Sequence, residues 1–194
     1  MKTLTYPFTR EQVLALRAGD EVSVNGLVRT GRDRFHHRFA SGAPLPCDFT
    51  DGALYHCGPV VLQGPDGAWR ALACGPTTSV RENPYEPDFI AASGVRVIIG
   101  KGGMDERTLE ACRRHGAVYL QAVGGAAALS AAAVERVAGV HFLEEFGAAE
   151  ACWEFEMRDF RCVVGMDAHG RSLFAEVRSA SEARFKDLIR KETK

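Results

Sequence analysis

The chain has 194 residues, of which 46% are hydrophobic and 25% charged, and its formal net charge is −1. These values suit a soluble globular protein with a sizeable core, and they leave no basic field to attract nucleic acid or acidic lipid. No apolar run approaches the roughly 20 residues of a membrane span, and no export signal follows Met1. We therefore expect a cytoplasmic protein that binds neither nucleic acid nor membranes.

The six cysteines are scattered, and none forms a C-x-x-C pair. They are Cys47, Cys57, Cys74, Cys112, Cys152 and Cys162. Isolated cysteines of a cytosolic protein are typically reduced and behave as small buried apolar residues. The sequence therefore predicts that this chain alone builds no complete zinc or iron–sulfur site.

The first half is rich in short strand patterns and glycine or proline turns. Residues 21–29 alternate as a half-buried strand does, with Asn25-Gly26 as a possible bulge or turn. A polar segment at 31–38 follows and suits a helix start with Asp33 in its first turn. Further short strands are expected at 54–57, 60–63 and 69–74.

The second half alternates between helix and strand patterns. Helices are predicted at 87–92, 105–115, about 126–136 and 181–191, and strands at 95–99, 117–123, 153–158, 162–167 and 172–176. Strands separated by glycine turns and helices favour right-handed crossovers and a parallel sheet portion, whereas the strand-rich first half and a late hairpin favour additional antiparallel pairing. We predict one mixed α/β domain spanning 1–194.

Three glycine-marked turns follow predicted strands, at 75–79, 100–103 and 124–125. Ligands gather at the carboxyl ends of strands in open α/β sheets, and glycines let backbone N–H groups approach an anion. Arg81 follows the first turn and Lys101 lies inside the second, so the pattern fits a small anionic molecule. Neither a phosphate-binding P-loop nor a dinucleotide fingerprint is present.

Each of these signals also has a purely structural interpretation. Ser79 and Glu82 fit an S-x-x-E capping box, so the first turn could simply start a helix, and Lys101 could be a solvated turn lysine. His36 and His37 are neighbours that point in different directions on a helix, which favours surface or supporting histidines over metal ligands. Both interpretations of the turns stay open at this point.

Six motifs in a fixed order carry a family resemblance. They are GRDRFHH at 31–37, GPTTSVRENPY at 75–85, GKGG at 100–103, YLQAVGGAAAL at 119–129, WEFEMRDF at 153–160 and DAHGRSLF at 167–174. In this order the chain resembles the carboxy-terminal domain of class I (iron–sulfur) fumarases and the β subunits of two-chain fumarases and L-tartrate dehydratases. The resemblance runs from about residue 20 to about residue 176.

The resemblance implies a swivelling β/β/α domain with a mixed sheet and a hydro-lyase that is active only with its α subunit. It implies a 4Fe-4S cluster with one open iron as Lewis acid, held by the partner α subunit, and an active site between the two parts. By position, Arg32, Arg81 and Lys101 match substrate-binding cations. Thr77 matches a substrate-binding threonine proposed to take part in proton transfer with a partner aspartate.

The expected reaction is the interconversion of fumarate and L-malate by a hetero-oligomer. The alternatives are the β subunit of L-tartrate dehydratase and a non-catalytic carboxylate-binding module of the same fold. Glu82 stands where the family usually has methionine, and an anion beside Arg81 could alter the preferred dicarboxylate. Arg161 replaces a common proline, which we expect to be neutral.

Overall fold

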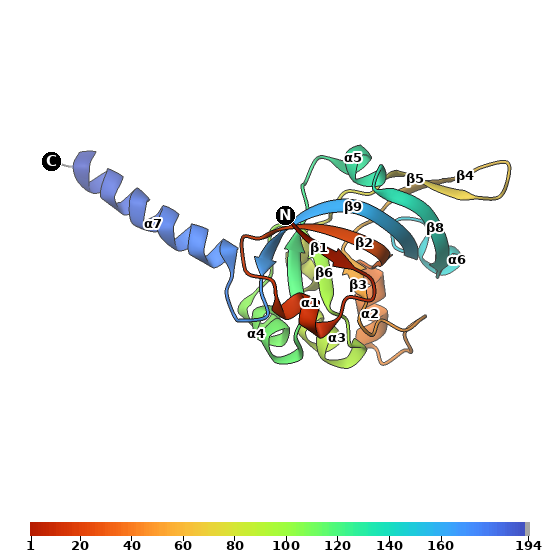
Figure 1. Ribbon diagram of the computed structural model, residues 1–194, viewed down its shortest axis with the longest axis horizontal. Coiled ribbons are helices and arrows are strands. Elements are labelled where there is room, and N and C mark those ends of the chain that lie inside the picture. Colours follow the sequence, from red (N-terminus) through yellow and green to blue (C-terminus); the bar gives the residue numbers. More distant parts are fainter. Residues whose placement is uncertain (193–194) are drawn as a thin grey trace.

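The computed structural model describes residues 1–192, and its centre is a seven-stranded mixed sheet (Figure 1). The strands lie in the order β1 (Lys2–Thr5), β2 (Glu21–Thr30), β3 (Ala53–Tyr55), β6 (Val97–Gly100), β7 (Val118–Gln121), β9 (Cys152–Met166) and β8 (Val134–His141). An additional pairing between β2 and β9 closes β2, β3, β6, β7 and β9 into a barrel-like ring. Two further strands, β4 (Val60–Gln63) and β5 (Trp69–Ala73), form a separate hairpin.

The sequence correctly predicts a parallel portion with additional antiparallel pairing, but the antiparallel hairpin expected at 162–167 and 172–176 does not form, and the first-half strands β1, β2 and β3 pair in parallel. The run β1–β2–β3–β6–β7 is parallel throughout, whereas β9 is antiparallel to β2, β7 and β8. The helices that connect or flank the strands are α1 (Arg10–Leu14), α2 (Asp33–Ala40), α3 (Glu86–Ser93), α4 (Glu106–His115), α5 (Ala127–Ala131), α6 (Leu143–Phe146) and α7 (Leu173–Glu192). The mixed α/β fold class and the mixed sheet are thereby confirmed.

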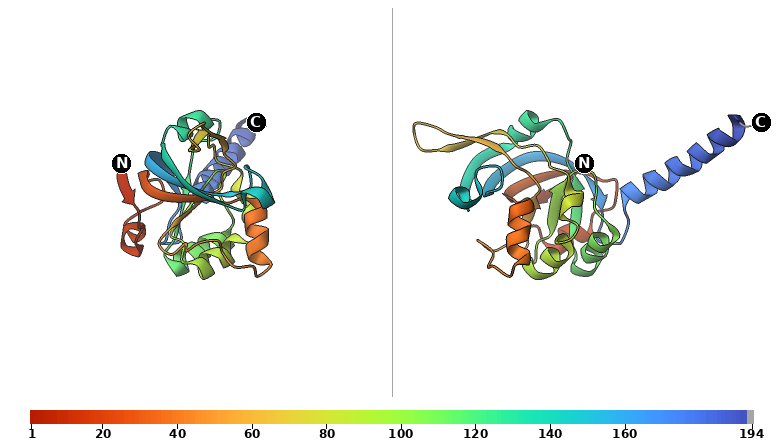
Figure 2. Two further views of the ribbon diagram at one scale, coloured as in Figure 1. Left: turned by 90° about the vertical axis from the view of Figure 1, so that its right-hand side faces the viewer. Right: turned by 180° about the vertical axis from the view of Figure 1, so that it is seen from behind.

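Two apolar clusters form the core on opposite sides of the central strands. Successive side chains of a strand point to opposite faces, and β6 shows the division. Val97 and Ile99 join the cluster inside the ring, while Ile98 joins the cluster under α2, α3 and α4. These three helices lie together beside the ring (Figure 2). Both faces of β6 are buried, which explains its unbroken apolar sequence.

Asn25 and Gly26 mark a bulge, as the sequence suggests. The register between β2 and β9 shifts between Val24 and Gly26, and Gly26 has a φ of +98°. Asp159 lies opposite, with a φ of +48°, and its N–H donates to the Asn25 side chain at 2.9 Å. The bulge lets β9 bend without breaking, so the two strands predicted at 153–158 and 162–167 are one 15-residue strand.

Two other predictions are wrong near the end of the chain. The alanine-rich helix ends at Ala131, not near 136, because Val134–His141 pairs with β9 as strand β8. The strand predicted at 172–176 is the start of α7, which also contains the helix expected at 181–191. Only Ser172 makes a strand-like bridge, to Met166.

The hairpin β4–β5 and helix α7 extend away from the ring (Figure 1). Both carry exposed apolar side chains, including Val60 and Leu62 on the hairpin and Phe185 and Leu188 on the helix. Exposed apolar side chains gathered on projecting elements are typical of contact surfaces. None of the helices formed by residues 1–192 combines the length and apolar character needed to cross a membrane.

Candidate functional site

Arg32 lies at the point where β2 passes into α2. It occupies the N-cap position of the helix, with Asp33 as the first helical residue, so the predicted helix start is confirmed. The guanidinium crosses Gly58, where an added Cβ would collide with it. Its Nη1 donates to the Ala149 carbonyl at 3.3 Å, and its Nη2 lies 3.3 Å from a Glu150 carboxylate oxygen.

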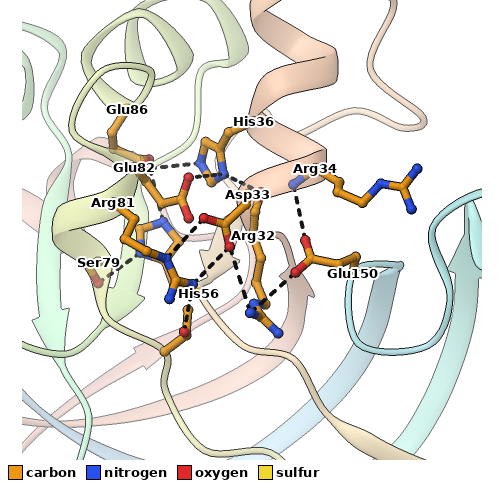
Figure 3. Close-up of polar contacts among 11 residues, drawn as sticks. Arg32, Asp33, Arg34, His36, His56, Ser79, Arg81, Glu82, Glu86 and Glu150 are labelled. Atoms are coloured by element: carbon orange, nitrogen blue, oxygen red, sulfur yellow. Dashed lines mark hydrogen bonds and ion pairs between the residues drawn. The ribbon is translucent and has the colours of Figure 1, made fainter.

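Arg81 and Thr77 approach the same place from the loop after β5. Arg81 donates two hydrogen bonds to the Asp33 carboxylate, at 3.0 and 2.9 Å, and a third to Thr77 Oγ1 at 3.0 Å. Arg32 Nη2 lies 3.8 Å from the same Asp33 carboxylate. Asp33 therefore stands between the two arginines and orients both (Figure 3).

Lys101 reaches this edge of the sheet at the end of β6. Its backbone bridges to Thr78 and exchanges hydrogen bonds with Ser79. Its aliphatic stem passes Gly124, where a Cβ would lie 3.3 Å from Lys101 Cδ, so the three predicted glycine turns do meet. Among the side chains described, those of residues 1–190, none forms a hydrogen bond or ion pair with the Lys101 ammonium, and Asp33 pairs with the arginines instead.

The predicted cations thus lie along one edge of the sheet, where they are connected in two different ways. Arg32, Thr77 and Arg81 share direct side-chain contacts through Asp33, whereas Lys101 is connected to them through the backbone of the first turn. Asp33 and Arg81 also line an open hollow of about 520 Å³ together with Arg34, His37, Arg38 and Tyr85.

The capping-box interpretation of Ser79 and Glu82 is wrong. The turn at Ser79–Glu82 is a single 3-10 helix, η1, whose N-cap is Thr78 and which has no side-chain cap hydrogen bond. The Ser79 hydroxyl instead lies 2.9 Å from His56 Nδ1 and 3.0 Å from the Tyr119 hydroxyl, and it accepts the Lys101 N–H at 3.2 Å. The turn ends at its C-cap Asn83, which directly precedes Pro84. The Glu82 side chain does not cap the start of the turn and is buried instead.

Beneath the arginines lies a fully buried polar cluster that the sequence analysis did not predict. His36 Nε2 and His56 Nε2 each lie 3.0 Å from the same Glu86 oxygen, Oε2. Glu82 Oε2 lies 3.3 Å from His36 Nδ1, and none of the four residues is exposed to solvent. Figure 3 shows the cluster directly behind Arg81 and Asp33.

Only weak signals in the sequence pointed to this cluster. The sequence favours a surface or supporting role for His36, whereas the structure buries this residue completely. His56 ends a short apolar strand, and Glu86 opens a helix, where acidic residues are common without any function. The signal that could have identified them is a polar residue beside an apolar segment. His56 follows the apolar residues 53–55, and Glu86 opens the helix at 86–93.

The pKa values of three residues in this cluster are shifted from their usual values. Burial opposes ionisation of Glu86, but the nearby imidazoles of His56 and His36 outweigh it and lower the pKa of Glu86 to about 2. Burial likewise opposes protonation of His36, and the hydrogen bond and charge of Glu86 and the charge of Glu82 raise its pKa nonetheless. Burial raises the pKa of Glu82.

The cluster contacts the backbone of three of the predicted site residues. His36 Nδ1 donates to the Arg32 carbonyl at 2.9 Å, and Thr77 N–H donates to the His56 carbonyl at 2.7 Å. Ser79 connects His56 to the backbone of Lys101. The buried cluster therefore sets the positions of the backbone segments that carry the cations.

The cysteines do not fit an iron–sulfur cluster. Burial raises the pKa of the Cys74 and Cys162 thiols to about 12 and holds the pKa of Cys57 well above its usual range. Cluster ligation requires thiolates gathered around one point. Among residues 1–192, each compact group of metal-ligating side chains includes at most one cysteine.

Replacing Ser79 by alanine should destabilise the protein by about 1–3 kcal/mol, since His56, Tyr119 and Lys101 lose a buried hydrogen-bond partner. Thr78→Ala is the matched control, because Thr78 makes no cap hydrogen bond, and it should cost less than about 0.5 kcal/mol. Urea denaturation of the two variants measures both costs. Equal costs would contradict the role assigned to Ser79.

Comparison with known proteins gives the family. The sequence model of the family described as "Fumarase C-terminus" matches residues 2–177. A Geobacillus stearothermophilus protein named as a class I fumarate hydratase is 46% identical over 92% of this chain, which spans 34% of that relative's length.

Two shorter relatives match along most of their own length. A protein of Methanocaldococcus jannaschii named as an L(+)-tartrate dehydratase β subunit is 40% identical over 93% of this chain and 95% of its own. The L(+)-tartrate dehydratase β subunit of Escherichia coli is 36% identical over 90% of this chain and 87% of its own. With a family match over nearly the whole chain and relatives of this similarity, the chain belongs to the Fumarase C-terminus family.

Proposed function

We propose that this chain is the β subunit of an iron–sulfur hydro-lyase that interconverts fumarate and L-malate, and that it binds the dicarboxylate through Arg32, Thr77, Arg81 and Lys101. The observation that carries the proposal is the contact set around Asp33. There Arg81 holds both Asp33 and Thr77 while Arg32 approaches the same carboxylate. Family membership supports the reaction class.

The arginines suit a dicarboxylate for a simple chemical reason. A guanidinium presents paired N–H donors that match the two oxygens of a carboxylate, as Arg81 already does with Asp33. Arg32 offers the same kind of donors from the other side of Asp33, and its side chain is 22% exposed. Lys101 adds a positive charge that no acidic side chain of residues 1–190 neutralises by direct contact.

These cations would also serve the chemistry. Addition of water to fumarate places hydroxyl on one carbon and a proton on the next, with negative charge developing beside a carboxylate. Fixed cations near that carboxylate stabilise the transition state more than the ground state. Thr77 Oγ1 accepts a hydrogen bond from Arg81, so its own proton is free to be donated, and the Arg81 charge stabilises the oxygen left behind.

A partner subunit completes this proposal. The cysteines of this chain do not suit a 4Fe-4S cluster, so we assign the cluster to a cognate α subunit, and we place the hetero-oligomer in the cytoplasm. Exposed apolar side chains on β4–β5 and α7 support a protein contact. We further propose that residues 1–194 form one domain of the swivelling β/β/α type.

L-tartrate dehydration is the second candidate. It is favoured by relatives of similar length to this chain that are named as L(+)-tartrate dehydratase β subunits. Glu82 does not decide between the substrates, because its carboxylate is fully buried beside His36 and faces away from solvent. The third candidate, a non-catalytic carboxylate-binding module, is disfavoured because all four proposed substrate-binding residues are present.

The deciding experiment uses the full chain with and without its α partner. The purified chain alone should hydrate no fumarate, whereas the complex with a cluster rebuilt without oxygen should convert fumarate or L-tartrate in a dicarboxylate panel. Activity of the chain alone would overturn the two-subunit proposal. An inactive complex with a loaded cluster would favour the binding module.

The cation set can be tested in the assembled enzyme. Arg81→Ala or Lys101→Ala should cost about 2–4 kcal/mol of transition-state stabilisation, the usual scale for losing a preorganised charge. Arg34→Ala is the matched control, because Arg34 lies over the Phe146 ring and points away from Asp33 (Figure 3). The measurement is kcat/KM, and a loss as large in Arg34→Ala would show that the effect is not specific to the site.

Thr77→Val keeps the branched shape of the side chain and removes its oxygen. If Thr77 transfers a proton, kcat in the assembled enzyme should fall by about 10²-fold or more, while cluster content and Tm barely change. Thr78→Val is the neighbouring control and should keep normal turnover. Near-normal turnover in Thr77→Val would remove the proton-transfer role from this residue.

A further inference from the structure

We propose that His36, His56 and Glu86 form a buried binding site for one divalent transition-metal ion, of which Zn²⁺ fits best. The three ligand atoms are His36 Nε2, His56 Nε2 and a Glu86 carboxylate oxygen, and they all lie within 4.8 Å of one another. None of the three residues is exposed. The proposal depends on this geometry alone and is independent of the proposed hydro-lyase activity.

The hydrogen bonds of His36 leave its Nε2 facing a carboxylate. Its Nδ1 lies 2.9 Å from the Arg32 carbonyl, which can only accept, so Nδ1 carries a proton. In the neutral ring Nε2 is then a lone pair, and it lies 3.0 Å from Glu86 Oε2. Two electron-rich atoms at this distance require a positive centre between them, which is either a second proton or a metal ion.

His56 repeats the same arrangement on the other side of Glu86. Its Nε2 lies 3.0 Å from the same Oε2, and its Nδ1 lies 2.9 Å from Ser79 Oγ, a hydroxyl that can donate or accept. When Ser79 accepts, Nδ1 carries the proton and Nε2 presents a lone pair, as in His36. Metal-binding histidines almost always have their second ring nitrogen held by a carbonyl, a carboxylate or another polar group. Both imidazoles here are held in that way, with Nε2 directed at a common point.

The buried carboxylates provide the second, independent observation. Both oxygens of Glu82 and Oε1 of Glu86 are buried and have no hydrogen-bond partner among residues 1–192. Buried carboxylate oxygens without donors are costly and rare. A divalent cation at the Glu86 oxygen would balance the charge of the two carboxylates, since Glu82 Oε2 lies 3.3 Å from the His36 ring at Nδ1.

The ligand types indicate which ion fits. Two imidazoles and one carboxylate are a known zinc-ligand set, whereas Mg²⁺ and Ca²⁺ prefer oxygen ligands. The 3.0 Å separations between ligand atoms are close to the roughly 3.3 Å expected around a tetrahedral ion with bonds of 2.0–2.1 Å. Glu86 Oε1, which has no donor, is available as a fourth ligand atom.

The site lies where an ion would hold the substrate-binding edge together. His36 contacts the Arg32 carbonyl, His56 the Thr77 N–H, and Ser79 joins His56 to Lys101. The ion would be structural, because it is buried beneath these residues. This departs from the expectation that the chain builds no complete metal site. No spacing motif connects ligands at 36, 56 and 86.

The test uses the full chain, stripped of metal and titrated with Co²⁺ and Zn²⁺ as probes. We expect binding of about one ion per chain, visible absorption typical of four-coordinate Co²⁺, displacement of Co²⁺ by Zn²⁺, and a higher Tm with metal than without. Glu86→Gln keeps the shape and should weaken Co²⁺ binding by at least about 10²-fold. His141→Ala is the matched control from the second compact group, Cys47, His141 and Glu154, and should bind normally.

The wild-type chain decides the matter even if Glu86→Gln does not fold. If it binds no Co²⁺ or Zn²⁺, and nitrogen NMR shows His36 with both ring nitrogens protonated at neutral pH, protons alone hold the cluster and the proposal fails. The proposal also fails if the Co²⁺ absorption is lost in His141→Ala and kept in Glu86→Gln, because the ion would then occupy the other group. A coordination shift of the His36 and His56 Nε2 signals on Zn²⁺ addition would support it.

Discussion

The pairing of β2 with β9 is the constraint on which the rest of this structure depends. It closes five strands into a ring and brings segments more than 100 positions apart in the chain into register, with Arg29 opposite Glu154. Thr30 ties the two strands together, because its hydroxyl donates to the Ala151 carbonyl and accepts the Trp153 N–H. Arg32 follows two residues later, so the closure of the sheet determines where its guanidinium points.

Closure also explains why Arg32 contacts the loop before β9. Ala149 and Glu150 lie three and two residues before that strand begins at Cys152, and they supply the carbonyl and the carboxylate that Arg32 contacts. Gly58 provides the space for the guanidinium to cross. An arginine at the same sequence position in an open sheet would have no such partners and would lie free in solvent, with the entropy cost of ordering it still to be met on binding.

The site combines exposed and buried charges that do different things. Arg81 and Asp33 are accessible to solvent, whereas Glu82 and Glu86 are fully buried. Burying two carboxylates and two imidazoles is costly, and proteins keep such groups where they specify one arrangement of the surrounding backbone. Here that backbone carries Arg32, Thr77 and Lys101.

Much of the candidate site could be predicted because its residues follow strands at glycine turns. Parallel strands end at the same edge of a sheet, so the turns after β6 and β7 meet, and Lys101 does pass Gly124. The turn after β5, which belongs to the separate hairpin, joins them through the bridge between Thr78 and Lys101. The direct contact of Arg81 with Thr77 and Asp33 could not be predicted from the sequence, because it depends on the direction in which the side chains point. The His36–Glu86–His56 cluster was not predicted, because its members come from three elements, no spacing connects them, and the local signals at each position are weak.

By itself the sequence determined the local elements whose signals lie within a few residues. Examples are α4, which begins after the Asp105 cap and ends at Gly116 in the left-handed conformation, and β4, with the predicted bounds Val60–Gln63. It also determined the family, through motifs in a fixed order. These features depend on hydrogen bonds and dihedral angles that neighbouring residues decide.

Only the tertiary structure decided β8, the continuity of β9 and the burial of Glu82. The alanine-rich helix pattern of the sequence extends to about residue 136. Residues 134–141 nevertheless form strand β8, because the backbone N–H and C=O groups of β9 beside them are available for pairing. The bulge opposite Asn25 keeps β9 continuous through a break in its pattern. Glu82 is buried because η1 packs against His36, a residue 46 positions earlier. Each outcome depends on a partner far away in the chain, and local propensity carries no information about such a partner.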